Sequence, residues 1–383
     1  MQSSVAGSAR IPNWNTKFVL PRHIPELDRL RGLAIILVLL RHSMSAMPAF
    51  AQRFAVQGWV GVDIFFVLSG FLITGILWDG RDQEKYFSRF YGHRVLRIWP
   101  VYLIMLSFVF LVIPLLKKIV GGSLMEIPRD PLGPWVYLLM IQNLFASSLS
   151  GSNFLRVTWS LAIEEQFYLV WPALIRILSR RAILLCFLTG VVSEPLIRVW
   201  AVHNGLTQAA IYENPLTHGD GLLCGAVVAV WLRCAKPKRS SLLFSGAALM
   251  IAGTCLFAPA FSIDASNQYA PALVFTGAAV ASTGLLLVAL VSENLGLVLR
   301  RTFFMNRTLA FFGFISYGLY LYHYVIFRFA GSERLAAKLD WLLSLDHAKQ
   351  AMMILGIGLS VLIAWLSRIT LEKAVLARKS MFG

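Results

Sequence analysis

Long apolar runs alternate with short polar stretches along most of the chain. A membrane-spanning helix needs about 20 mostly apolar residues, and ten segments come close to that length. This pattern predicts an all-α, polytopic integral membrane protein with about ten transmembrane helices around a central cavity. A further apolar run, 134–146, is too short to cross, so we expect it to be re-entrant or interfacial. The ten predicted spans are 33–50, 60–78, 98–116, 159–178, 182–201, 216–233, 241–259, 270–291, 309–330 and 350–370.

Basic residues between these runs set the predicted orientation. With the amino terminus in the cytoplasm, the predicted cytoplasmic segments hold 24 of the 35 Lys and Arg residues, as the positive-inside rule requires. Counting 134–146 as a span would reverse every later segment and lose this bias. We therefore expect both termini in the cytoplasm, with tails at 1–23 and 373–383 and one transmembrane domain at 24–372.

Composition agrees with a membrane protein. The chain is 57% hydrophobic and 14% charged, whereas soluble domains average about a quarter charged. The net charge is +16, and the basic residues are scattered over short loops. This distribution is better explained by membrane orientation than by nucleic-acid binding. The amino-terminal segment shows no signal-peptide pattern. The cysteines have no metal-ligand spacing, so we expect no metal site and buried, small apolar roles for Cys186, Cys224, Cys234 and Cys255.

Ionisable residues inside a span usually mark a functional site, and the first span carries two candidates. Arg31 and His42 are 11 residues apart, which is three helical turns plus about 20°, so both lie on one face with a rise of roughly 16 Å. Asp28 falls on nearly the same line, and Arg41 points about 80° away. The structural alternative is that Arg31 only anchors the helix at the headgroups and His42 only bonds a neighbouring helix.

Two further spans combine polar residues with close-packing signals. Glycines in 58–77 permit close helix approach, and Asp63 lies early in this span, toward the outer side. The Ser69-Gly70 pair predicts tight packing or a local kink. Arg94 and Arg97 occupy adjacent turns at the cytoplasmic mouth of the third span, where they either anchor the helix or bind a polyanion, since guanidinium forks match phosphate oxygens.

Acidic residues and histidines also occur at the predicted outer ends of later spans. Glu164 and Glu165 lie about one turn into 159–178, with Tyr168 close enough in helical spacing to extend either network. Two carboxylates inside an apolar helix indicate that the helix faces a cavity and that at least one of them pairs with a basic residue. The remaining candidates are His218 and Asp220 in 216–233 and His323 in 309–330. These residues either bind substrate or belong to an interfacial aromatic and polar belt.

Five stretches, in this order, resemble the acyltransferase-3 family of membrane-bound O-acyltransferases. They are "PELDRLRGLAIILVLLRH", "GWVGVDIFFVLSGFLIT", "RFYGHRVLRIWPVYL", "WSLAIEEQFYLVWP" and "FISYGLYLYHYVI". The family's arginine, ten residues and histidine are matched by Arg31 and His42, and the resemblance runs from about residue 24 to 370. It implies a multi-pass protein of the bacterial inner membrane with a ten-span core. Some members carry a fused extracytoplasmic hydrolase-like domain, which this sequence does not show, so we expect the membrane domain itself to meet the acceptor.

The resemblance also implies a reaction. The family's usual donor is acetyl-coenzyme A, a co-substrate and not a bound cofactor, and its acceptors are glycans or glycosylated molecules. The polyphosphate end of the donor would then meet Arg31, Arg94 and Arg97, and the thioester would reach His42. His42 either deprotonates the acceptor hydroxyl or is itself acylated and relays the group. Glu164 or Glu165 would orient its imidazole or hold acceptor hydroxyls.

Two other classes use the same features. A transporter or flippase would use the buried charges as a substrate path and would show flux without ester formation. A non-catalytic scaffold would do neither. An enzyme predicts thioester consumption that is lost when His42 is removed, and the motif set favours the enzyme.

Overall fold

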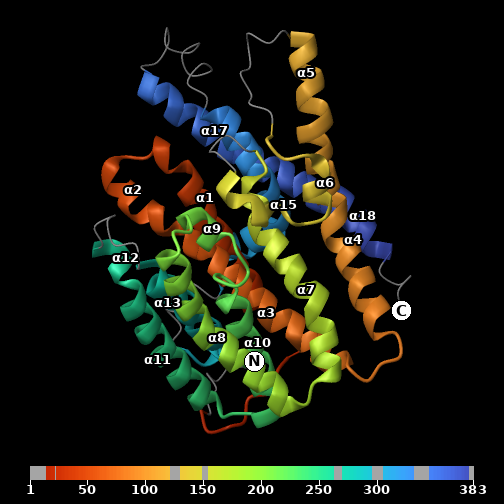
Figure 1. Ribbon diagram of the computed structural model, residues 1–383, viewed down its shortest axis with the longest axis vertical. Coiled ribbons are helices and arrows are strands. Elements are labelled where there is room, and N and C mark those ends of the chain that lie inside the picture. The colour runs from red at the N-terminus through yellow and green to blue at the C-terminus, as the bar shows by residue number, and fades with distance from the viewer. Residues whose placement is uncertain are drawn as a thin grey trace, which may run out of the picture.

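The computed structural model describes residues 14–21, 23–120, 130–148, 154–262, 270–295, 305–331 and 345–378, and this part of the chain is a bundle of helices without a named strand (Figure 1). The longest helices are α1 (Pro25–Ser43), α3 (Val60–Gly80), α4 (Tyr86–Ser107), α7 (Trp159–Ile177), α8 (Arg180–His203), α10 (Asp220–Ala235), α11 (Arg239–Phe257), α13 (Ala270–Leu290), α15 (Arg307–Ala330) and α17 (Leu345–Ser367).

Shorter elements connect or extend these helices. They are η1 (Met44–Ala46), α2 (Ala49–Ala55), η2 (Val56–Trp59), η3 (Phe108–Val112), α5 (Ile113–Val120), α6 (Pro134–Leu138), η4 (Gln142–Ser148), η5 (Arg156–Thr158), α9 (Gln208–Tyr212), α12 (Pro259–Ser262), η6 (Ser292–Asn294), η8 (Arg368–Glu372) and α18 (Lys373–Leu376).

Every predicted span falls on a helix, so the helical membrane fold is confirmed. Among the described residues, seven helical stretches are long and apolar enough to cross a membrane: 49–80, 86–119, 180–203, 239–257, 272–290, 307–330 and 347–376. Helices α1, α7 and α10 are not among them, because α10 has only 16 residues and the other two carry several charges. The count of ten spans therefore stays a prediction. The apolar run 134–146 forms only the five-residue α6 and part of η4.

The first span differs from its predicted bounds. Helix α1 begins at Pro25 and ends at Ser43, whereas the sequence predicted a span over 33–50. The chain then turns through η1, and Pro48, with no N–H to donate, directly precedes α2. His42 consequently lies in the last turn of α1 and not midway along a helix that continues to residue 50.

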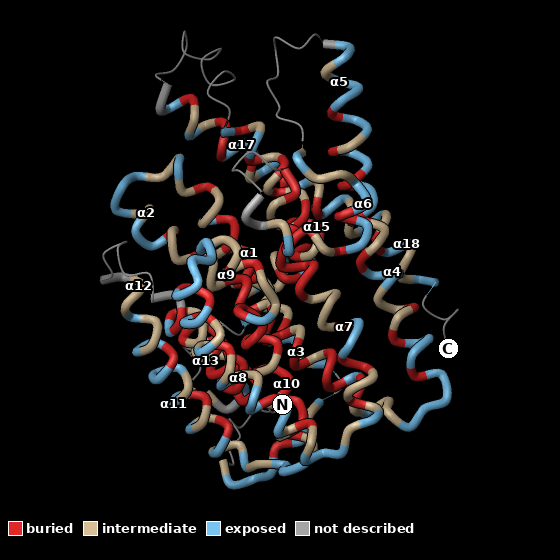
Figure 2. The backbone as a smooth tube through the Cα atoms, viewed as in Figure 1, coloured by how far each residue is buried: buried red, intermediate tan, exposed pale blue. Residues whose placement is uncertain are grey.

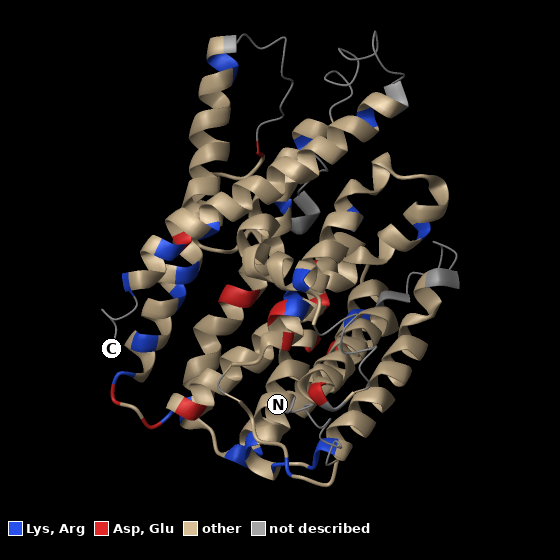
Figure 3. Ribbon diagram, turned by 180° about the vertical axis from the view of Figure 1, so that it is seen from behind, with Lys and Arg blue, Asp and Glu red and all other residues tan. Residues whose placement is uncertain are grey.

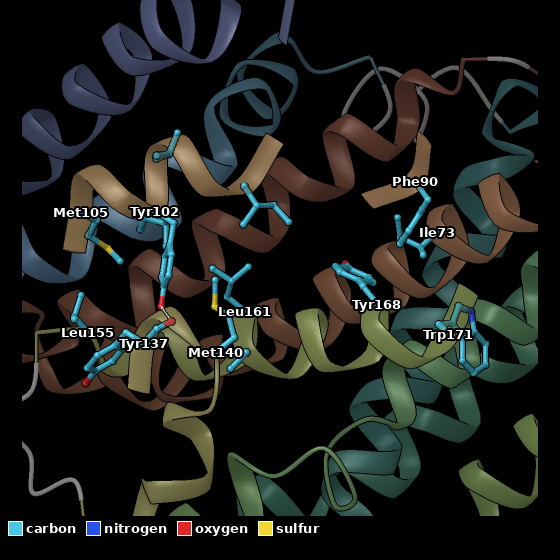
Figure 4. Packing of buried hydrophobic residues seen from close by; sticks show 14 of the residues in the cluster. Ile73, Phe90, Tyr102, Met105, Tyr137, Met140, Leu155, Leu161, Tyr168 and Trp171 are labelled. Atoms are coloured by element: carbon cyan, nitrogen blue, oxygen red, sulfur yellow. Dashed lines mark hydrogen bonds between the residues drawn. The ribbon is translucent and has the colours of Figure 1, made fainter. Parts of the chain in front are cut away.

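The core of the bundle is built from the faces that these helices turn toward one another (Figure 2). Helix α1 packs on α3 and α15, α3 packs on α10, and α11 packs on α13. One buried cluster joins α3, α4 and α7; Figure 4 shows Tyr102 donating its hydroxyl to the Tyr137 carbonyl, 3.0 Å away. In the same cluster, the Trp171 indole donates to the Thr74 hydroxyl at 2.8 Å.

Large apolar side chains also cover much of the outside, as lipid contact requires. Leu185, Leu188 and Leu196 on α8, and Ile354 and Leu355 on α17, are all more than half exposed. Three of the cysteines share this outward environment. Only Cys224 is buried, whereas the exposed ones are Cys186, Cys234 and Cys255, so the expectation of four buried cysteines was wrong for those three.

Four of the predicted cytoplasmic segments meet at one end of the bundle. The amide of Phe18 donates to the Pro237 carbonyl at 2.8 Å, which joins the amino-terminal segment to the α10–α11 connection. Arg233 pairs with Asp79 at 2.7 Å, and Arg176 donates to the Gln83 carbonyl at 3.1 Å. Basic residues gather at this end and along α4 and α18 (Figure 3). The segments share one side, as the charge pattern predicted, and which side faces the cytoplasm stays a prediction.

Candidate active site

The two histidines of α1 and α15 form a hydrogen-bonded pair. The Nδ1 atom of His42 lies 3.0 Å from Nε2 of His323, and Nδ1 of His323 lies 2.9 Å from the Leu319 carbonyl oxygen. His323 is fully buried, whereas His42 is partly exposed. Sequence reasoning named both histidines but did not bring them together, because they are separated by 281 positions.

These bonds fix where the protons of the neutral pair lie. A carbonyl oxygen only accepts, so Nδ1 of His323 carries the hydrogen and its Nε2 is an acceptor. Nδ1 of His42 must then be the donor, which leaves Nε2 of His42 with an unprotonated lone pair. Among the described residues, no side chain forms a hydrogen bond with that atom. His42 is thereby presented as a base or nucleophile.

Two glycines allow α1 and α15 to approach closely enough for this pair. A Cβ atom added at Gly32 would lie 1.9 Å from the Leu309 carbonyl oxygen, and one at Gly313 would lie 1.8 Å from the Asp28 carbonyl oxygen. Both distances are far inside van der Waals contact, so these positions exclude any side chain. The close crossing brings the last turn of α1 against α15, and His42 against His323.

The predicted donor-binding arginines line one cavity of about 670 Å³, which we call the arginine cavity. It lies between α3, α4, α7 and α15, and Arg31, Arg89, Arg94 and Arg97 all contribute to it. Asp28 accepts a hydrogen bond from Arg31 at 2.7 Å. The Arg94 guanidinium lies 3.9 Å from the centre of the Tyr168 ring. Among the described residues, Arg97 forms no ion pair, and its side chain lines this cavity.

The two glutamates of α7 lie away from the histidine pair. Glu164 lines the arginine cavity and accepts hydrogen bonds from Ser69 at 2.8 Å and Tyr168 at 3.0 Å. Glu165 does not line the arginine cavity, and its Oε1 is buried without a partner among the described residues. Glu164 and Arg94 line the same cavity, which therefore extends past the middle of α7, and the predicted outer position of Glu164 stays a prediction. The imidazole of His42 contacts His323 and neither glutamate.

The remaining predicted residues form two buried polar networks beside α10. Asp63 and His218 are fully buried, with Oδ1 and Nε2 3.2 Å apart, and Nδ1 of His218 bonds the Tyr212 carbonyl at 2.7 Å. Asp220 pairs at 3.2 Å with Arg198, which is also fully buried. Sequence reasoning missed Arg198, although an arginine inside the apolar span 182–201, four residues after Glu194, was a signal for it. His218 was predicted to reach the outer surface, but its side chain is fully buried and is therefore not accessible from either side of the bundle.

His42 lines a second cavity, of about 850 Å³, which we call the histidine cavity. Arg41, Arg156 and Arg328 contribute guanidinium groups to its lining, and Glu213 contributes a carboxylate. Arg41 was expected to point away from His42, but the cavity wraps around the end of α1 and takes in both. Arg156, Glu213 and Arg328 were not predicted, since each lies at a helix end or in a connection where a charge is unremarkable.

The arginine cavity and the histidine cavity meet at a partition formed by the residues that line both. Val62 and Tyr320 are the residues that line both. The Tyr320 hydroxyl donates to the Val157 carbonyl at 2.8 Å and lies 2.5 Å from the Ser160 hydroxyl. Ser160 lines the arginine cavity and Val157 the histidine cavity. Arg31 and His42 thus share one helix but face different cavities.

Comparison with known proteins places this architecture in a family. Over 334 residues the chain is 31% identical to the peptidoglycan O-acetyltransferase OatA of Listeria monocytogenes, covering 80% of this chain and 49% of that protein. It is also 31% identical over 325 residues to the putative peptidoglycan O-acetyltransferase YrhL of Bacillus subtilis (80% and 49%). Identity to the O-acetyltransferase OatA of Staphylococcus aureus is 28% over 332 residues (82% and 52%).

The chain spans about half the length of the curated relatives it matches. No solved structure matches it. The family model described as an acyltransferase domain matches residues 24–369, nearly the whole chain, and therefore the protein belongs to the acyltransferase-3 family.

Proposed function

We propose that the protein is a membrane O-acyltransferase that moves an acyl group, in the simplest case acetyl, from acyl-coenzyme A to a hydroxyl of a glycan acceptor. The observation that carries this proposal is the free Nε2 lone pair of His42, which the hydrogen bonds through His323 to the Leu319 carbonyl leave open to the histidine cavity. The relatives' names, which specify O-acetylation and in two cases peptidoglycan, support the reaction and a glycan acceptor.

The arginine cavity suits the donor. Arg31, Arg94 and Arg97 line it together, and guanidinium groups bind phosphate oxygens through paired hydrogen bonds. We propose that the donor's nucleotide phosphates bind here and that the pantetheine arm passes Val62 and Tyr320 toward His42. Helix α1 is continuous between Arg31 and His42, so the arm would cover roughly 16 Å along it.

Chemistry at His42 follows from its protonation. Nε2 takes the proton of the acceptor hydroxyl while that oxygen attacks the thioester carbonyl carbon. The carbon–sulfur bond then breaks, and the imidazolium returns the proton to the departing thiolate. The relay that the sequence left open begins instead with attack of Nε2 on the thioester. In that case coenzyme A is released in one equivalent before any acceptor is added, which a rapid-quench experiment detects.

This proposal is tested by removing the base. The full chain in nanodiscs is given radiolabelled acetyl-coenzyme A and soluble peptidoglycan fragments, and ester formation is measured. His42→Ala should lower the turnover 10²–10⁴-fold, the contribution typical of a positioned base. His203→Ala, at the exposed end of α8, is the matched control and should keep wild-type turnover. More than about a tenth of the activity in His42→Ala would refute the catalytic role.

A further inference from the structure

The histidine cavity carries more positive than negative charge. Three arginines line it, and Glu213 is its one acidic lining residue among those the structure describes. Glu213 lies in the connection between α9 and α10 and pairs with Arg156, whose Nε is 3.2 Å from Oε1. Arg41 and Arg328 have no carboxylate partner within the described ranges; the one hydrogen bond of Arg41 goes to the Met44 sulfur.

The protonation of Glu213 does not remove this excess. Burial raises the pKa of the Glu213 carboxyl, and the adjacent Arg156 guanidinium opposes that rise. An ionised Glu213 neutralises Arg156 and leaves two uncompensated guanidinium groups, and a protonated one leaves three. Uncompensated cations in a partly enclosed cavity attract an anion more strongly than they would in bulk water.

These charges lie close to the reactive atom. Arg41 directly precedes His42 in the last turn of α1. On α15, the ring of Tyr324 is 5.1 Å from the ring of His42, and Arg328 lies one helical turn beyond Tyr324 on the same face. Arg328 is exposed and lines the cavity. An anionic group held there would lie in the same cavity as the imidazole of His42.

The other walls suit a carbohydrate. Trp59, Tyr212, Phe275 and Tyr324 line the same cavity, and each is partly exposed. Aromatic faces pack against the apolar C–H faces of pyranose rings, while the side chain of Gln208 supplies an amide group that can bond hydroxyls. Such a mixture of aromatic surface and a few polar groups is typical of a specific ligand pocket.

We infer that the acceptor is an anionic glycan, whose carboxylate or phosphate binds Arg41 and Arg328 while a nearby hydroxyl faces His42. This inference rests on the proposed function, because it names the acceptor class of the same site. The guanidinium forks match both anions, and the carboxylate of a uronic or other acidic sugar is the form tested below.

The test uses two probes that differ only in charge. Tetragalacturonate and its full methyl ester are titrated into the full chain in phosphatidylcholine nanodiscs, without a donor, and binding is followed by tryptophan fluorescence. The acid should bind at least about tenfold more tightly than the ester, and added salt should shrink the difference. Arg328→Gln should remove most of this preference, and Arg53→Gln, on the exposed surface of α2 outside the cavity lining, should keep it.

Two results would overturn the inference. One is equal affinity for acid and ester; the other is an acid preference that survives in Arg328→Gln. The anion that binds the cavity could instead be a lipid headgroup, which nanodiscs containing phosphatidylglycerol test. If this lipid abolishes acid binding in the wild-type chain, the cavity binds lipid headgroups and the inference fails. Because no donor is present, acceptor binding is measured without acyl transfer, so a failure of the acyl-transfer proposal is seen separately from a failure of this one.

Discussion

Replacing His323 tests whether the histidine pair sets the chemistry. In His323→Phe, Nδ1–H of His42 loses its acceptor 3.0 Å away, and the imidazolium formed during the reaction loses its only side-chain hydrogen-bond partner among the described residues. A hydrogen bond to a charged group contributes about 1.5–3 kcal/mol. At about 1.4 kcal/mol per tenfold change in rate, kcat should fall roughly 10–150-fold. The KM for acetyl-coenzyme A should not change, because His323 lies outside the arginine cavity.

The conservative replacement separates positioning from simple packing. A glutamine at 323 offers an amide oxygen to His42 and an amide N–H to the Leu319 carbonyl, so His323→Gln should recover most of kcat. Tyr324→Phe keeps the ring that lies 5.1 Å from that of His42 and should change kcat by less than about threefold. Steady-state kinetics of the full chain in nanodiscs gives both parameters. If His323→Phe keeps kcat within about twofold, or if Gln and Phe lower it equally, the assigned tautomer of His42 is wrong.

Three further predictions concern the donor site, the helix crossing and the orientation. Arg31→Ala should weaken coenzyme A binding in nanodiscs by about tenfold and Arg31→Lys should recover only part of it, since an ammonium cannot make the forked contact; unchanged affinity in Arg31→Ala would make it a headgroup anchor. Gly313→Ala should lower thermal stability and acyl transfer, because overpacking costs about 1–3 kcal/mol, whereas Gly358→Ala, with nothing within 4 Å of its added Cβ, should do neither. In a variant without native cysteines, a cysteine at position 94 should react only with membrane-permeant reagents and one at 328 with impermeant ones. Labelling of both from one side would contradict the prediction that the two cavities open to opposite sides of the membrane.

Local periodicity was enough to predict what each helix contributes. The spacing of Arg31 and His42 predicted one face of a single helix; α1 contains both residues, and along it they line two different cavities. The spacing of Arg94 and Arg97 predicted one basic surface, and both line the arginine cavity. Hydropathy located a helix in every predicted span, because burial in lipid demands long apolar runs whatever the tertiary arrangement.

Contacts between distant segments could not be predicted in this way. The partner of His42 is on α15, and its position depends on how closely the glycines allow α1 and α15 to cross. Arg156 and Arg328 belong to the histidine cavity only because the ends of α7 and α15 meet beside the end of α1. Helical spacing gives the direction of a side chain on its own helix, but not the neighbouring helix that it meets.

Under the proposed function, the partition would let one helix serve two compartments without opening a pore. Val62 and the hydrogen-bonded Tyr320 separate a cavity suited to a polyanionic donor from one suited to a glycan. A continuous channel of this size would let water and protons leak through the membrane and would admit water to the thioester. Under the proposed function, only the narrow pantetheine arm and its acyl group need to pass Tyr320, while the nucleotide and the glycan stay on their own sides. The partition therefore favours small acyl groups, since a long or branched acyl chain would have to displace the Tyr320 ring and break its bond to the Val157 carbonyl.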